Sequence, residues 1–115
     1  MSGRLQSYNR YLVKTGETDK AYPGRVSVAG AAIDLPTIPA DTNSAVVAII
    51  AASGAVAGTV IANYRLDGGD PTTVLGMPLY SGGEIQLFES EVENFRIIAA
   101  DGLTHSLAVE FGKVE

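Results

Sequence analysis

The feature that most constrains the fold is a run without charge from Thr42 to Tyr64. It contains no Asp, Glu, Lys, Arg or His and reads TNSAVVAIIAASGAVAGTVIANY. A membrane-spanning helix needs about 20 mostly apolar residues, so this run of 23 residues is long enough to be one. A buried helix is a second interpretation. The third is a pair of apolar β-strands joined by a turn.

The residue types within this run favour the two strands. Val and Ile, which are enriched in strands, fill both halves. Ser53-Gly54 and Gly58-Thr59 interrupt the run with residues that are typical of turns. We therefore predict that residues 44–52 and 59–66 form paired strands connected by residues 53–58, and that the chain has no membrane partner.

The first of these predicted strands is apolar on both faces. Val47 and Ile49 lie on one face, whereas Val46, Ala48 and Ile50 lie on the other. A strand of this kind needs cover on both of its faces. In a chain of 115 residues the second cover can come from another subunit. We therefore predict that Val47 and Ile49 bind a partner, in a homodimer or a higher oligomer.

The rest of the chain predicts an all-β fold of one domain. It has 13 Gly, no Cys and short apolar segments between turn signals. We expect further strands at residues 25–33, 72–75, 84–88, 94–100 and 104–111, with one helical turn near 89–93. Asp101-Gly102 predicts a hairpin between the last two strands. The expected fold is a single β-sandwich, jelly-roll or immunoglobulin-like, of about seven or eight short strands.

Charge divides the chain into an extended basic arm, residues 1–24, and a sandwich domain, residues 25–115. Residues 1–25 carry five basic and two acidic groups, whereas residues 26–115 carry three basic and eleven acidic groups. The acidic domain would repel phosphates, so we expect no nucleic-acid partner. The arm is either a solvated tail or a docking segment, and its aromatic residues favour docking. Its predicted partner-binding residues are Arg4, Tyr8, Arg10, Tyr11 and Lys14.

Catalytic motifs are missing from the sequence, and we predict a non-enzyme without a cofactor. His105 is the one histidine and there is no cysteine, so a zinc site is not expected and His105 is expected to be a polar surface residue. Asp67 and Asp70 share one turn and suggest either a calcium site or, as we favour, local hydrogen bonds to backbone amides. The acidic segment 89–93 suggests either a carboxylate pair for glycoside hydrolysis or, again favoured, a solvated loop.

Several strand ends and turns resemble those of a known class of proteins. The segments are YRLDGGDPT (64–72), GMPL (76–79), GGEI (82–85), NFRIIAADG (94–102) and LAVEF (107–111). Their order resembles small β-sandwich virion proteins of tailed double-stranded DNA phages, over residues 45–111. The resemblance implies a structural role in a virion and does not specify the position in it. We expect a protein made in the host cytoplasm that decorates, or cements, the capsid surface through contact with the major capsid protein, with an arm that grips the shell by analogy with that class.

A binding module is the alternative from another class. β-Sandwiches bind carbohydrate through exposed aromatic side chains and loop carboxylates, and Tyr80, Phe88, Asp67 and Asp70 are the candidates here. A position in the neck or tail of the virion, as an accessory module, is a further alternative. A small hydrolase is the least favoured class, because no base is poised beside a nucleophile.

Overall fold

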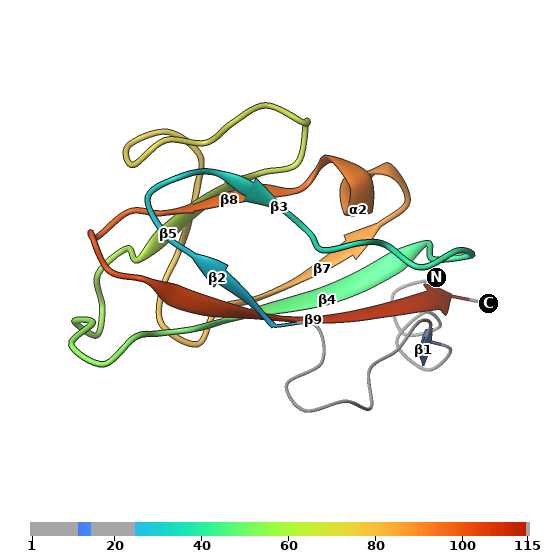
Figure 1. The fold of residues 1–115 in the computed structure, drawn as a ribbon, viewed down its shortest axis with the longest axis horizontal. Helices are drawn as coiled ribbons and strands as arrows, with labels where there is room; N and C mark the ends of the chain where they lie inside the picture. The colour runs from blue at the N-terminus through green and yellow to red at the C-terminus, as the bar shows by residue number, and fades with distance from the viewer. Residues whose placement is uncertain (1–11, 15–24, 115) are drawn as a thin grey trace, which may run out of the picture.

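The computed structural model describes residues 12–14 and 25–114, which form two antiparallel sheets packed face to face (Figure 1). This architecture confirms the predicted all-β sandwich. Eight of the described strands fall within residues 25–115, and the ninth lies in the arm. The strands are β1 (Leu12–Lys14), β2 (Val26–Val28), β3 (Ile33–Asp34), β4 (Ser44–Ile50), β5 (Ala62–Arg65), β6 (Met77–Leu79), β7 (Glu84–Phe88), β8 (Arg96–Ala99) and β9 (His105–Val114), with the short helix α2 (Ser90–Asn94) between β7 and β8.

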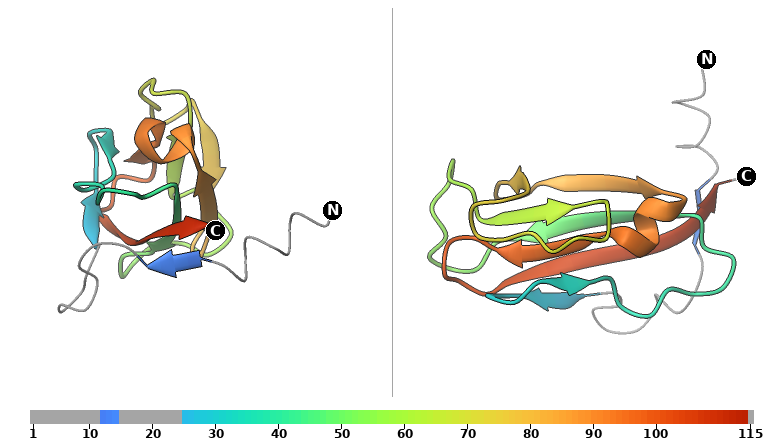
Figure 2. Two further views of the ribbon diagram at one scale, coloured as in Figure 1. Left: turned by 90° about the vertical axis from the view of Figure 1, so that its right-hand side faces the viewer. Right: turned by 90° about the horizontal axis from the view of Figure 1, so that it is seen from above.

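Most connections in this fold cross from one sheet to the other. The first sheet has the order β1-β9-β4-β7, with β2 also paired to β9, and the second has the order β3-β8-β5-β6. The links that follow β2, β3, β4, β6, β7 and β8 therefore change sheet, whereas β5 and β6 are neighbours. Figure 2 shows the sandwich from two further directions, with β1 at the edge of the first sheet.

The core lies between the two sheets and is built by alternating residues. In β4, Ala45, Val47 and Ile49 are buried, whereas Val46 and Ala48 are half-buried and Ile50 is 38% exposed. The inward residues of β9 alternate in the same way, and Leu107, Val109 and Phe111 are buried. Residues in the second sheet or directly before its strands close the core from the other side, among them Ile61, Leu79, Phe95, Ile97 and Ala99.

The placement of Val47 and Ile49 corrects one prediction. Both side chains are almost completely buried inside this chain, at 0% and 2% exposure, so they are not available to a partner. The second sheet covers their face of β4 and forms the core with them. The apolarity of the other face, at Val46, Ala48 and Ile50, matches a half-buried surface rather than a second core.

Strand β9 connects the arm to the sandwich. Along one edge it pairs with β4 from Ser106 to Gly112. Along the opposite edge it pairs with β2 at its start, where Val28 faces His105, and with β1 at its end, where Lys14 faces Gly112. The predicted arm therefore contributes a short edge strand to the first sheet.

Two predicted strand pairings were wrong. Residues 44–50 and 62–65 do form strands, but β4 pairs with β7 and β9, whereas β5 pairs with β6 and β8. The Asp101-Gly102 turn likewise joins β8 of the second sheet to β9 of the first, so it does not make a hairpin. Both connections arch over the core, because each strand must place one apolar face inward from its own sheet.

Two predicted strands also have different bounds. The predicted strand 25–33 is split into β2 and β3, which lie in different sheets. Residues 72–75 form a turn, and the neighbouring strand is β6, which contains Pro78. Proline is tolerated there because β6 is at the edge of its sheet. The helical turn expected near 89–93 is present as α2.

The charge-free run is not a membrane helix. Its residues form β4 and the first three residues of β5, with a loop between them. Among residues 12–14 and 25–114, no helix combines the length and the apolarity needed to cross a bilayer.

Candidate functional site

An ordered turn at residues 72–75 holds apolar side chains in solvent. The N–H of Thr72 donates to the Leu75 carbonyl at 2.9 Å, and the N–H of Leu75 donates back to the Thr72 carbonyl at 3.3 Å. The Val74 N–H donates to Thr72 Oγ1 at 3.2 Å. The buried Asn63 fixes the turn to β5, because its Nδ2 donates to the Thr72 carbonyl at 2.9 Å. The turn is therefore fixed, although its tip is exposed.

The side chains that this turn displays form an exposed apolar surface, which we call the 72–77 patch. It consists of Val74, Leu75 and Met77, which are 91%, 53% and 57% exposed. Exposed apolar groups that gather in one place mark contact surfaces more often than scattered ones do. The patch is therefore the first candidate for a functional surface.

An open hollow of about 690 Å³ lies beside this patch. Tyr64, Leu66, Leu75 and Met77 give it an apolar lining, and Arg65 and Asp67 provide its polar part. Tyr64 is held from behind by Phe95, whose ring centroid is 5.8 Å away. The hollow is shallow and open with a mainly apolar lining, which suits contact with an apolar side chain of another surface.

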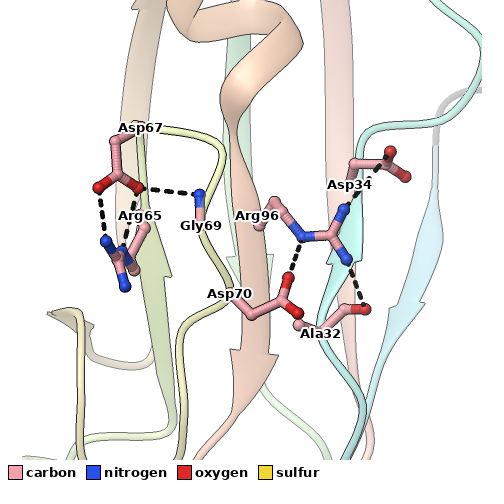
Figure 3. Close-up of polar contacts among 7 residues, drawn as sticks. All are labelled: Ala32, Asp34, Arg65, Asp67, Gly69, Asp70 and Arg96. Atoms are coloured by element: carbon pink, nitrogen blue, oxygen red, sulfur yellow. Dashed lines mark hydrogen bonds and ion pairs between the residues drawn. The ribbon is translucent and has the colours of Figure 1, made fainter.

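A cluster of charges lies next to the hollow, across three strands of the second sheet (Figure 3). Arg65 and Arg96 are cross-strand partners on β5 and β8, and Asp34 faces Arg96 from β3. The turn 67–70 brings one aspartate to each arginine. Asp67 binds Arg65 through both carboxylate oxygens, at 3.0 and 2.5 Å, and Asp70 Oδ1 lies 2.5 Å from Arg96 Nε.

These contacts decide between the two interpretations of Asp67 and Asp70. The local amide bond that we favoured is confirmed for Asp67, since the Gly69 N–H donates to its Oδ1 at 3.0 Å. The hydrogen bond from Arg65, and then that from Gly69, hold the pKa of Asp67 below its ordinary value. The two carboxylates bind different arginines, so they do not form the pair of ligands that a calcium site in this turn would need. No group of three or more potential metal ligands occurs in the part of the chain that the structure describes.

His105 is buried, which corrects the prediction of a surface residue. Its side chain has no exposed area. The Ala52 N–H donates to its Nδ1 at 2.9 Å, and its Nε2 lies 2.8 Å from Asp101 Oδ1. This pattern defines the neutral tautomer with the proton on Nε2, which donates to Asp101. The histidine thus joins the loop after β4 to the start of β9.

Asp101 completes this buried contact. Burial raises the pKa of its carboxyl group, but the hydrogen bonds from His105 and from the Leu103 N–H outweigh burial, and the net pKa is lowered. An aspartate–histidine pair also occurs in hydrolases, where the second ring nitrogen takes a proton from a nucleophile. Here that nitrogen is occupied by the Ala52 N–H. The imidazole has no lone pair left for a substrate.

The acidic segment near α2 has a structural contact. Glu91 Oε1 accepts a hydrogen bond from the Phe88 N–H at 2.9 Å, next to the start of the helix. This bond uses one of the carboxylates that glycoside hydrolysis would need, and Glu89 and Glu93 are exposed.

The other predicted site residues do not come together. Arg4, Tyr8, Arg10 and Tyr11 lie outside the described residues, and Lys14 is in β1, opposite Gly112. Among the residues proposed for carbohydrate binding, Phe88 is half-buried in β7 of the first sheet. Tyr80 follows the end of β6 that faces Ala62, far along the strand from the Asp67 turn. A shared sugar site built from these residues is therefore not formed.

Comparisons with known proteins add no further assignment. No family model, no curated protein and no solved structure matches the chain.

Sequence reasoning missed the 72–77 patch, because residues 72–75 were predicted to form a short strand. One signal was present. Gly76 follows Leu75 and adopts a φ of 136°, which interrupts a strand at that point.

Proposed function

We propose that this chain is a non-enzymatic structural protein of a phage virion that decorates the capsid and binds the major capsid protein. The observation that carries the proposal is the pairing of β1 with β9, which fixes a segment of the basic arm to the edge of an acidic sandwich. The resemblance of residues 45–111 to small β-sandwich virion proteins supports the same class.

A structural role is supported by the chemistry of the described residues. The one histidine has both ring nitrogens in hydrogen bonds. Asp67 and Asp70, in the turn after β5, form ion pairs with arginines of the second sheet. Groups that are satisfied within the fold stabilise it and have no free capacity for proton transfer. The chain is therefore better suited to bind a surface than to transform a substrate.

The arm gives a physical basis for attachment. Residues 1–25 carry a net charge of about +3 by residue type, and Tyr8 and Tyr11 add aromatic area. β1 anchors this segment through the pairs from Leu12–Val114 to Lys14–Gly112. Because the arm and the sandwich are joined by backbone pairing, binding of the arm to a shell also fixes the sandwich on that shell.

The mechanism would be stabilisation of the assembled shell by mass action. A protein that binds only the assembled shell shifts the equilibrium towards it by RT ln(1 + [L]/Kd). Many copies on a symmetric lattice add to this effect, since each contact holds neighbouring shell subunits together.

Cosedimentation with expanded, undecorated phage heads tests this function. We expect the full chain to pellet with the heads and to lose at least about tenfold in affinity when residues 1–11 are deleted. Rising salt should weaken attachment, because it screens attraction between exposed charges. At physiological ionic strength this attraction already falls off over a distance of about 8 Å. A full chain that stays in the supernatant at saturating concentration contradicts the proposal.

The same preparation separates the alternatives. Binding to a glycan array and not to heads would support the carbohydrate-binding module. Density at the neck or tail in an image of the intact virion would move the protein to that part of the particle.

A further inference from the structure

We propose that the 72–77 patch is a two-fold contact surface, on which the Val74 turn of one copy of this chain enters the hollow of a second copy. This contact is separate from the capsid attachment proposed above, which uses the arm on the first sheet. The patch belongs to the second sheet, next to β5 and β6. In Figure 1 the loop between β5 and β6 lies on the side of the molecule opposite β1.

The first argument is self-complementary shape. Val74 projects from a turn that four hydrogen bonds hold in place, and it is 91% exposed. The apolar hollow begins at the next residues, Leu75 and Met77. A surface that carries an apolar projection beside an apolar depression can bind a copy of itself about a two-fold axis, with each projection in the other copy's depression.

The second argument is charge. Residues 26–115 carry an excess of eight negative charges, so most contacts between two copies are opposed by repulsion. Beside the hollow, Arg65 pairs with Asp67 and Arg96 pairs with Asp70. Arg96 also lies 3.8 Å from Asp34, so the cluster carries two positive and three negative charges. Two copies therefore meet less repulsion here than at a surface where carboxylates stand without arginines.

The third argument concerns the edge of the sheet. β6 is an edge strand, which in many proteins invites another chain to extend the sheet. Pro78 lies in the middle of β6 and has no N–H to donate. A contact at this edge must therefore be made by side chains, and Met77 is the exposed apolar side chain in β6.

The size of the patch sets the expected strength. A stable interface usually buries about 800 Å² on each partner, which a few partly exposed side chains do not reach. The dimer should therefore be weak in solution, with a Kd on the order of 100 µM, and should matter where copies are held side by side.

Sedimentation of the full chain from about 10 to 500 µM tests the contact. We expect a concentration-dependent dimer, and we expect Val74→Asp to raise its Kd at least about tenfold because the contact would bury a charge. Val56→Asp is the matched control, since Val56 is a valine 63% exposed in the loop after β4. It adds the same charge elsewhere and should leave the dimer unchanged. Met77→Lys should act like Val74→Asp.

A crosslinking experiment tests the proposed geometry. The chain has no cysteine, so a single engineered cysteine is unique in each copy. A mixture of Val74→Cys and Met77→Cys proteins should form a mixed disulfide under mild oxidation much faster than the Val56→Cys protein crosslinks with itself.

Each outcome has a defined meaning. A parent protein that stays monomeric at 500 µM, or a Val74→Asp variant that dimerises like the parent, overturns the proposed contact. Loss of the dimer on deletion of residues 1–11 but not in Val74→Asp would assign self-association to the arm and also overturn it. Salt separates this proposal from capsid attachment, because screening should strengthen a contact between two acidic copies and weaken attachment of the basic arm.

Discussion

Arg65 and Arg96 face each other on neighbouring strands of the second sheet, and the turn that follows β5 supplies an aspartate to each of them. Like charges directly opposite each other destabilise a sheet. The turn Asp67-Gly68-Gly69-Asp70 relieves this repulsion. Its two aspartates are three residues apart, and each forms an ion pair with a different arginine. Gly69 passes over Arg65 so closely that an added Cβ would lie 2.9 Å from the guanidinium carbon. Shape and charge are thus linked in one short turn.

Replacement of Asp70 by Asn should lower stability by up to about 1 kcal/mol, since the ion pair with Arg96 is only partly shielded from solvent. Urea denaturation checks the change, and the difference between parent and variant should shrink in 1 M salt. An unchanged difference in high salt would show that charge is not the cause.

Replacement of Gly76 by Ala should destabilise the fold by about 1–3 kcal/mol. Gly76 has a φ of 136°, and an added Cβ would lie 3.0 Å from the Tyr64 carbonyl oxygen, which is backbone and cannot move aside. Gly30→Ala is the control, because its Cβ would meet nothing within 4 Å and its φ is ordinary. Equal midpoints for both variants in urea would contradict the strain argument. Gly68 also has a positive φ, of 83°, so Gly68→Val should be destabilising for the same reason.

The Asp101–His105 contact should make stability depend on pH in the acid range. The pKa of Asp101 is lowered from 3.8 in the folded chain, so its contribution is present above that value and is lost as the pH falls through the lowered pKa. Asp101→Asn should therefore cost about 1 kcal/mol at neutral pH and progressively less between about pH 5 and pH 2. Thermal unfolding of both proteins across that range measures the difference, and a gap that widens towards low pH would contradict the assignment.

Replacement of Ile49 by Ala should cost about 2–5 kcal/mol, because it leaves a cavity in the core. Ile50→Ala, one residue further along β4, should cost less than about 1 kcal/mol, since Ile50 is exposed on the other face. Both should leave the dimer at the 72–77 patch intact at concentrations where the protein is folded. A monomeric but stably folded Ile49→Ala protein would instead support the original prediction that Ile49 binds a partner.

Much of the strand pattern could be predicted from the sequence, because burial follows local alternation. Leu107, Val109 and Phe111 are inward-facing, as a period of two residues requires. Pairing could not be predicted in the same way. The Asp101-Gly102 turn is compatible with a hairpin and with an arch between sheets, and only the packing of β8 and β9 against the core decides between them.

The candidate site was harder to predict than the fold. Val74 and Leu75 are apolar, and an apolar segment next to a β-branched pair normally indicates a strand. Their exposure follows from bonds between distant residues, such as that from Asn63 to Thr72, which no local pattern encodes. His105 was misplaced for a similar reason, since its partner Ala52 lies 53 residues away in the sequence.

Because Leu12 pairs with Val114, the start of β1 lies beside the end of β9. Paired residues of neighbouring strands lie about 5 Å apart, so a link of a few residues is enough to join the end of β9 to the start of β1. New ends can then be opened at Ser53-Gly54, which is exposed and lies in the loop after β4. Such a circularly permuted chain should keep the same two sheets, because contacts across β9, and not the position of the termini, define which strands are neighbours.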